Sequence, residues 1–216
     1  EQIGRLMDTV REIFTLDEDA EITMEMNPGT VTEEKLRKYR QAGVNRLSIG
    51  LQSVNDEELR LLGRIHTYEE FREAYHLARA NGFSNINVDL ISAIPGQTVE
   101  SWRRTLEQVM ALSPEHISAY SLILEEGTTF YKKYVEDEAK EGPKLPDEDA
   151  ERQMYWDTEM LMEKNGYHRY EISNYAKEGY ACRHNLGYWE RIPYLGFGIG
   201  AASLVPGDLI GKCRKL

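Results

Sequence analysis

Four short segments of the chain alternate strictly between apolar and polar residues, which is the pattern of a half-buried strand. Between them, apolar residues recur at helical spacing. The pattern predicts strands over residues 21–27, 46–52, 85–91 and 116–123. It predicts four helices between and after them: one that ends near Gly43, one from Ser53 through Leu62, one that stops at Gly82 and one over 99–112. Alternating strands and helices with short connections predict a parallel sheet with helices outside.

Helix start signals support these assignments. Thr30-Val31-Thr32-Glu33 and Thr67-Tyr68-Glu69-Glu70 each offer a capping box, in which a threonine and an acid three residues later bond each other's backbone N–H groups. Ser53 is placed to cap the short helix after the second strand.

The polar face of the predicted strands is the first functional clue. A parallel strand covered on both faces normally reads as a continuous apolar run, but each of these four has one polar face. Those faces carry Glu21, Thr23, Glu25 and Asn27; Arg46, Ser48, Gly50 and Gln52; Asn85, Asn87 and Asp89; and His116, Ser118 and Tyr120. Each unsatisfied polar group costs about 1–3 kcal/mol. We interpret the pattern as a curved, barrel-like sheet around a polar ligand; an exposed antiparallel sheet face would alternate too, but helical connections argue against it.

The pattern changes after residue 127. Helices are expected over 129–141 and 147–165, around a breaker-rich linker, followed by a strand over 167–173. An irregular aromatic stretch (174–193) and a glycine-rich strand from Tyr194 to Leu204 complete the prediction. The fold class is therefore α/β, a partial (β/α) barrel over residues 1–127 followed by a smaller α+β region over 128–216.

Composition narrows the function classes. A net charge of −11 repels phosphate backbones and makes nucleic acid an unlikely partner. Part of the excess is a local acidic stretch, interpreted as a solvated surface: Glu136, Asp137, Glu138, Glu141, Asp147, Glu148, Asp149 and Glu151. No apolar run approaches the roughly 20 residues of a membrane span. The cysteines, Cys182 and Cys213, form neither a disulfide framework nor a metal knuckle, so a reducing cytoplasm is expected.

An ordered series of motifs runs along most of the chain. It reads Glu25-Met26-Asn27-Pro28-Gly29-Thr30, Arg46-Leu47-Ser48-Ile49-Gly50-Leu51-Gln52-Ser53, Leu62-Gly63-Arg64-Ile65-His66, Asn87-Val88-Asp89-Leu90-Ile91, Pro95-Gly96-Gln97-Thr98, Ile117-Ser118-Ala119-Tyr120 and Glu125-Glu126-Gly127-Thr128. The series resembles the oxygen-independent coproporphyrinogen III oxidase family of radical S-adenosylmethionine proteins. The resemblance implies a partial barrel that carries a four-iron cluster and S-adenosylmethionine.

By motif match, the resemblance implies that Glu25, Gln52, Arg64 and Asp89 contact S-adenosylmethionine. Their chemistry suits its amino group, carboxylate and ribose hydroxyls. Taken singly, Arg64 also reads as a surface ion-pair partner, and either acid as a strand-end hydrogen bonder. Ile123 and Ala202 align with apolar or backbone contacts of the family.

The chain departs from the family at both ends. The family's Cys-x3-Cys-x2-Cys cluster loop and its glycine-rich S-adenosylmethionine motif are absent from the sequence. Both are expected upstream of Glu1, so no metal ligand of the cluster is expected in this chain, which cannot by itself supply three or four thiolates. The tail from Asp208 to Leu216 does not continue as the family would, which suggests a second truncation or a reading-frame change.

Cys182-Arg183-His184-Asn185-Leu186-Gly187-Tyr188-Trp189, which follows Tyr170-Glu171-Ile172-Ser173-Asn174-Tyr175, resembles the H-N-x-x-Y-W signature of the family's haem chaperone branch. The resemblance implies that His184 ligates haem iron while Tyr188 and Trp189 pack on the macrocycle. The alternatives for these residues are a hydrogen-bonded histidine in an aromatic loop, or Cys182 as the ligand.

Three functions therefore stand side by side at the sequence level. The first is a haem chaperone that delivers haem to membrane respiratory proteins, with the cluster and S-adenosylmethionine serving binding or assembly. The second is a coproporphyrinogen III oxidase, whose polycarboxylate substrate would require basic groups that this sequence does not cluster. The third is an incomplete barrel without activity of its own.

Overall fold

The computed structural model describes residues 1–137 and 142–206. They form two compact units, residues 1–180 and, within 181–216, the described part up to 206. The first unit holds a six-stranded sheet in the order β1-β2-β3-β4-β6-β5. Its strands are β1 (Thr23–Met26), β2 (Arg46–Gln52), β3 (Ile86–Ser92), β4 (His116–Ser121), β5 (His168–Arg169) and β6 (Asn174–Ala176). The first four are parallel, and β6 joins β4 antiparallel.

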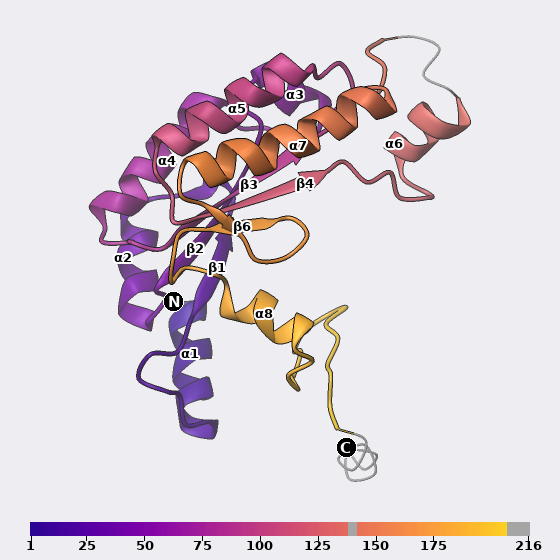
Figure 1. Ribbon diagram of the computed structural model, residues 1–216. Helices are drawn as coiled ribbons and strands as arrows, with labels where there is room; N and C mark the ends of the chain where they lie inside the picture. Colours follow the sequence, from indigo (N-terminus) through magenta and orange to yellow (C-terminus); the bar gives the residue numbers. More distant parts are fainter. Residues whose placement is uncertain (138–141, 207–216) are drawn as a thin grey trace. The chain divides into compact units, whose positions relative to one another are not determined.

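The helices of the first unit are α1 (Gln2–Ile13), α2 (Glu33–Ala42), α3 (Asp56–Leu61), α4 (Tyr68–Ala80), α5 (Val99–Ala111), the short α6 (Thr129–Tyr131) and α7 (Glu148–Lys164); α8 (Arg183–Trp189) belongs to the second unit. Helices α2, α4, α5 and α7 lie along one face of the sheet, whereas α6 lies beyond the end of β4 (Figure 1). The predicted fold class, a mostly parallel sheet with surrounding helices, is confirmed.

The apolar faces of the strands and helices make the core. Alternation puts Leu47, Ile49 and Leu51 of β2 on the helix side, where they are fully buried. Large side chains of α4 and α5 pack in the same cluster, among them Phe71, Tyr75 and Trp102. Burial of a large apolar side chain is worth about 1.5–3 kcal/mol, so this face holds the sheet against its helices. The polar face of the sheet is not part of this core.

Local contacts correct two of the predicted helix starts. Helix α2 is capped by Thr32, whose side chain accepts from Lys35 N, and not by the predicted box starting at Thr30, because Pro28–Thr30 form a 3₁₀ turn. Helix α3 is capped by Asn55 and not by Ser53. The Thr67–Glu70 capping box is confirmed.

The region after β4 departs most from prediction. The helix expected from residue 129 is α6 followed by a π-helical turn, Lys132–Glu136, and its end at 138–141 lies outside the described residues. The strand expected over 167–173 is instead the β5–β6 pair around a turn. The prediction of a glycine-rich strand from 194 to 204 is wrong, because these two end residues form an isolated bridge instead. Helix α8 lies where an irregular stretch was expected. The predicted boundary near residue 128 stays a prediction; α7 and β5–β6 pack in the first unit.

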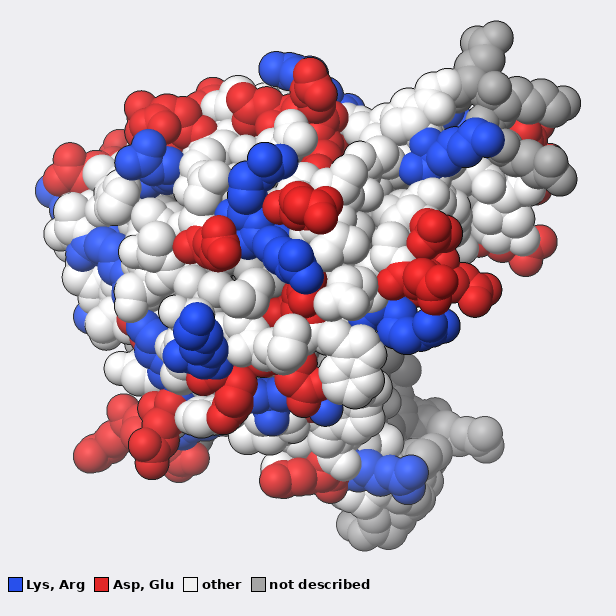
Figure 2. All heavy atoms as spheres, turned by 45° about the horizontal axis from the view of Figure 1, so that its top comes forward, with Lys and Arg blue, Asp and Glu red and all other residues white. Residues whose placement is uncertain are grey.

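Charged side chains of both signs are interspersed over the face seen in Figure 2. The described members of the acidic stretch, at positions 136, 137, 147–149 and 151, are exposed, as the solvated interpretation expects. Glu138, Glu141, Cys213 and the tail from Asp208 lie outside the described residues. Within the described ranges, no helix is long and apolar enough to cross a membrane.

Candidate functional site

Two adjacent rows of side chains cross the polar face of the sheet. Residues paired between parallel strands lie side by side on the same face. The first row runs through Glu25, Ser48, Asn87 and His116, and the second through Gly50, Asp89, Ser118 and Asn174. The register therefore brings Glu25 and Asp89, two of the sequence-predicted residues, into one polar neighbourhood.

The Asp89 carboxylate is the acidic centre of this face. Ser48 Oγ donates to its Oδ2 at 2.9 Å, and Asn87 Nδ2 donates to its Oδ1 at 2.8 Å. Burial raises the pKa of the Asp89 carboxyl and the Glu25 charge adds to the rise, while hydrogen bonds from Ser48, Asn87 and Ser118 oppose it. A partly desolvated, hydrogen-bonded carboxylate suits recognition of a ligand amino group or hydroxyl.

Gln52 reaches the same face through an unusual backbone. Its φ is 75°, a left-handed conformation rare for a residue other than glycine, and the β2–β3 register shifts between Gly50 and Gln52. A Cβ atom placed on Gly50 would lie 2.8 Å from Gln52 Nε2, so the amide lies over Gly50. Gly50 pairs with Asp89, which puts the Gln52 amide above the second row. Such backbone strain, about 1–3 kcal/mol, clusters at ligand sites.

Arg64 lies on the loop between α3 and α4, near the carboxyl end of β2. His66 Nε2 lies 3.2 Å from the backbone oxygen of Leu51, which anchors this loop beside Gln52. Arg64 is half-buried and forms no salt bridge with any residue of the described ranges, so its predicted role as a surface ion-pair partner finds no support there. A guanidinium in this position is available to a carboxylate.

A buried histidine, which sequence reasoning gave no role, extends the network. His116 is 0% exposed; its Nδ1 lies 2.6 Å from Asn87 Oδ1 and its Nε2 lies 2.7 Å from Tyr170 Oη. Burial and, second, the charge of Arg46 lower the pKa of His116 to about 3. Arg46 is itself 3% exposed, and its Nε has no hydrogen-bond partner among the described residues. The strict alternation of the strands was the signal that placed both residues on this face.

Glu58 of α3, also missed, joins three segments at the end of β2. It is 6% exposed. Its Oε2 accepts from Ser53 Oγ at 2.6 Å and Gln97 Nε2 at 2.8 Å, and its Oε1 accepts from Ser101 Oγ at 3.0 Å. The carboxylate therefore ties the segment after Gln52 to the turn before α5 and to the first turn of α5, where the helix dipole favours a negative charge.

The second unit contains the predicted aromatic site. His184 and Tyr188 are one helical turn apart on α8, so their rings meet edge to face with centroids 4.6 Å apart. The ring of Tyr194, which sequence reasoning missed, also meets that of Tyr188, with the ring centroids 4.8 Å apart. His184, Tyr188 and Trp189 are all exposed. Further exposed apolar side chains follow along the chain: Ile192, Leu195, Phe197 and Ile199. Ala202 lies in this unit and Ile123 in the first, both exposed.

An iron–sulfur cluster does not fit the residues present. Clusters are held by three or four thiolates, and Cys182 is the cysteine of the described ranges. Within those ranges, no group of three or more His, Cys, Asp or Glu side chains could hold a metal ion. Cys182 is buried, directly before α8, which argues against its serving as a surface ligand. No step of the function can be derived through a cluster held by this chain.

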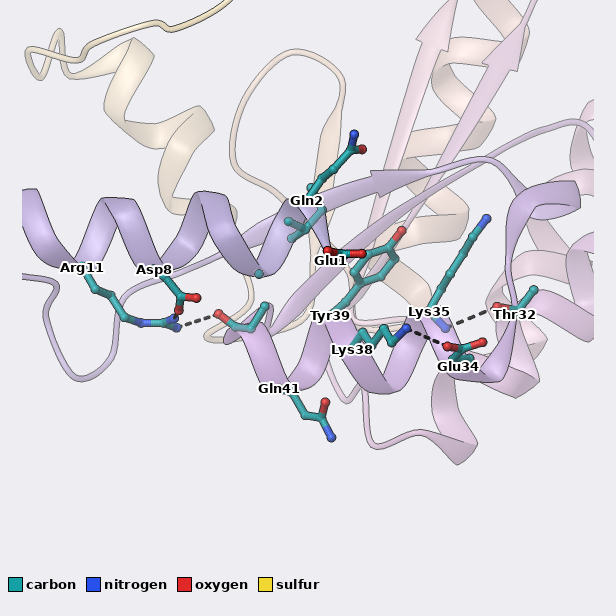
Figure 3. A pocket seen from close by; sticks show the side chains of 13 residues that line it. Glu1, Gln2, Asp8, Arg11, Thr32, Glu34, Lys35, Lys38, Tyr39 and Gln41 are labelled. Carbon is teal, nitrogen blue, oxygen red and sulfur yellow. Dashed lines mark hydrogen bonds and ion pairs between the residues drawn. The ribbon is translucent and has the colours of Figure 1, made fainter.

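A cavity of about 870 Å³ lies between α1 and α2 and does not involve the predicted site residues. Its wall includes charged side chains of both signs, among them that of the first residue, beside uncharged ones such as Tyr39 and Gln41 (Figure 3). Lys38 pairs with Glu34 and Arg11 donates to the backbone oxygen of Ala42, so the charges drawn there partly satisfy one another. A smaller cavity of about 120 Å³ beside β1 is lined in part by Glu25.

Known proteins are similar to this chain in sequence. Residues 3–109 match the radical SAM superfamily. Over 201 residues the chain is 41% identical to the heme chaperone HemW of Haemophilus influenzae, covering 93% of this chain and 50% of that protein. Over 196 residues it is 43% identical to HemW of Escherichia coli, covering 91% and 50%. The chain therefore spans about half the length of the curated relatives it matches.

A solved structure matches the fold closely. It is that of the coproporphyrinogen III oxidase HemN from Escherichia coli, described as a radical SAM enzyme. The TM-score is 0.76 at 28% sequence identity, and the match covers 94% of this chain and 49% of that one.

Proposed function

The chain belongs to the radical SAM superfamily, and on that premise we propose that the protein is a haem chaperone: it binds haem and passes it to acceptor proteins. The observation that carries the proposal is the exposed His184 on α8 with its ring against Tyr188. An accessible imidazole can ligate haem iron, and aromatic and apolar side chains can cover a macrocycle. The two bacterial relatives, which are named heme chaperones, support the same function.

The polar face of the sheet is the proposed S-adenosylmethionine site. Glu25 and Asp89 would accept from the amino group or ribose, Gln52 would hold either a donor or an acceptor, and Arg64 would clamp the carboxylate. The register that gathers the first two, the Gln52 amide above Gly50, and the loop anchored at Leu51 support this assignment. When bound with a cluster, S-adenosylmethionine supplies radical chemistry; the cluster ligands would have to come from outside the described residues.

The haem acceptors we propose are membrane respiratory proteins, served from the cytoplasm. Trp189, next to Tyr188 and more than half exposed, and the apolar side chains after it provide the surface that such a hand-over requires. Exposed apolar patches mark sites of this kind of interaction.

A second candidate function is oxidative decarboxylation of coproporphyrinogen III. It is favoured by the structural match to an oxidase of that name. The test uses the full-length protein, reconstituted anaerobically with iron and sulfide. It is incubated with S-adenosylmethionine and coproporphyrinogen III, together with a low-potential reductant that starts cleavage of S-adenosylmethionine and an electron acceptor for the oxidation. The chaperone proposal expects no protoporphyrinogen on chromatography from a cluster-loaded sample. Product over many turnovers would replace it by the oxidase.

A further inference from the structure

The orientation of one side-chain amide decides whether Asp89 faces donors or an acceptor. Asn87 lies two residues before Asp89 in β3, on the same face. Its Nδ2 donates both to Asp89 Oδ1 and, at 2.7 Å, to Ser48 Oγ, whose own proton goes to Asp89 Oδ2. Turned by 180°, the amide would set its oxygen against the carboxylate, and two acceptors in contact repel. Something must therefore hold the amide in its observed orientation.

Ser118 Oγ lies 3.1 Å from Asn87 Oδ1, and His116 supplies a closer constraint on the same oxygen. Its Nδ1 lies 2.6 Å from Asn87 Oδ1, close enough for a strong hydrogen bond if Nδ1 carries the proton. In a neutral imidazole one nitrogen donates and the other accepts, so Nε2 must then accept a proton from its own neighbour. That neighbour is the Tyr170 hydroxyl, 2.7 Å away. A neutral His116 in the Nδ1–H tautomer therefore donates to Asn87 and accepts from Tyr170.

The chain of bonds reaches a distant segment. Tyr170 lies in the turn between β5 and β6, 54 residues from His116. A second connection runs beside it: Ser118 Oγ donates to Asn174 Oδ1 at 2.6 Å, and Asn174 Nδ2 donates to Glu171 Oε1 at 2.6 Å. The β5–β6 turn is therefore hydrogen-bonded to the polar face at two points, both within the first unit.

We propose that His116 and Asn87 are positioning residues of the S-adenosylmethionine site: Tyr170 fixes the tautomer of His116, which orients the Asn87 amide so that its N–H groups hold the Asp89 carboxylate. The inference rests on the proposed function, in which Asp89 contacts S-adenosylmethionine. Neither positioning residue has to touch the ligand. The β5–β6 turn then sets how strongly Asp89 binds.

A pH dependence follows from the same geometry. The Asn87 donor helps to keep the Asp89 carboxyl ionised, so turning the amide away raises the pKa of Asp89 and moves ligand binding to higher pH. The titratable and charged groups that face this network are Glu25 from β1, Arg46 from β2, His116 and Tyr120 from β4, and Tyr170 and Glu171 from the β5–β6 turn. These groups are common to the variants compared below, except His116 and, in Tyr170→Phe, Tyr170.

Two substitutions of His116 separate the positioning role from a merely structural one. An asparagine amide can occupy the place of the imidazole Nδ1, so His116→Asn keeps a donor to Asn87. A glutamine amide reaches the place of Nε2, so His116→Gln keeps the contact with Tyr170 and loses the donor to Asn87. Binding of S-adenosylmethionine by the full-length protein is measured by calorimetry from about pH 4 to about pH 9.

We expect His116→Asn to bind within about threefold of wild type, and His116→Gln to bind about tenfold more weakly at neutral pH with its binding midpoint at higher pH. Equal affinity of both variants and wild type would overturn the inference, and so would equal weakening of both. Absence of binding by wild-type protein would instead refute the proposed function. If His116→Gln unfolds, Tyr170→Phe removes one hydroxyl and is expected to raise the midpoint as well; an unshifted midpoint there would also overturn the inference.

Discussion

Replacing Glu58 by alanine tests whether the buried carboxylate holds the end of β2 in place. The substitution removes three hydrogen bonds, from Ser53, Gln97 and Ser101, at a residue that is almost fully buried. The two serine hydroxyls can turn to other partners; Ser101 Oγ already lies 3.1 Å from the Thr98 backbone oxygen. The Gln97 amide cannot, because its Oε1 already lacks a partner among the described residues and its Nε2 would lose one too.

The expected loss follows from these bonds. A hydrogen bond to a charged group contributes about 1.5–3 kcal/mol, and a buried donor left without a partner costs about 1–3 kcal/mol. Rotation of the serines offsets part of the total, so Glu58→Ala should lower the free energy of unfolding by about 3 kcal/mol. For a chain of this length that corresponds to a Tm lower by about 6–12 °C. Glu58→Gln keeps the volume and one acceptor oxygen and should lose about 1–2 kcal/mol.

The assay is urea unfolding followed by circular dichroism, with Glu57→Ala as the matched control. Glu57 precedes Glu58 in the first turn of α3 and is exposed, so its loss removes a helix-dipole interaction of about 0.3–1 kcal/mol. A loss in Glu58→Ala no larger than that of Glu57→Ala would refute the reasoning, because burial and three donors would then contribute nothing.

Three further predictions concern the core, the site and pH. Trp102→Phe should lower the free energy of unfolding by about 2 kcal/mol, since the fully buried indole N–H donates to α7, whereas the half-exposed Trp156→Phe should change it by less than about 0.5 kcal/mol in urea titrations. Gly50→Ala should displace the flexible end of Gln52, weakening S-adenosylmethionine binding about tenfold by calorimetry while stability changes by less than about 1 kcal/mol. The pKa of His116 is lowered to about 3 in the folded protein, against about 6.5 when the chain is unfolded. At a pH between these two values, the unfolded state therefore binds more protons than the folded state. Wild type should therefore lose about 2 kcal/mol more stability than His116→Asn on going from about pH 7 to about pH 5, and parallel losses would contradict this.

The strands were predictable because their pattern is local. Strand β2 was expected over residues 46–52 and lies at Arg46–Gln52, since a period of two leaves no choice of face once one side is buried. The same alternation placed Asp89 and His116 on the polar side. It could not show that His116 bonds Tyr170, a partner 54 residues away, because sequence spacing carries no information about contacts made across a sheet.

The errors have separate local causes. Ser53 looks like a helix cap, but its hydroxyl donates to Glu58, and Asn55 caps α3 instead. The aromatic segment after Cys182 shows no clear helical period, because Gly187 interrupts it, yet residues 183–189 form α8. The glycines after Tyr194 read as a strand, but turns leave a bridge between the two end residues.

The central claim, that the protein binds haem through α8, is tested most directly by haem titration of the full-length protein, followed by absorption spectroscopy. Wild type is expected to give a saturable haem spectrum. His184→Ala should shift or abolish those bands, with affinity reduced about tenfold or more. The control is His168→Ala, which removes another exposed imidazole and should leave the spectrum unchanged. An identical spectrum and affinity in His184→Ala would contradict the account and point to another ligand.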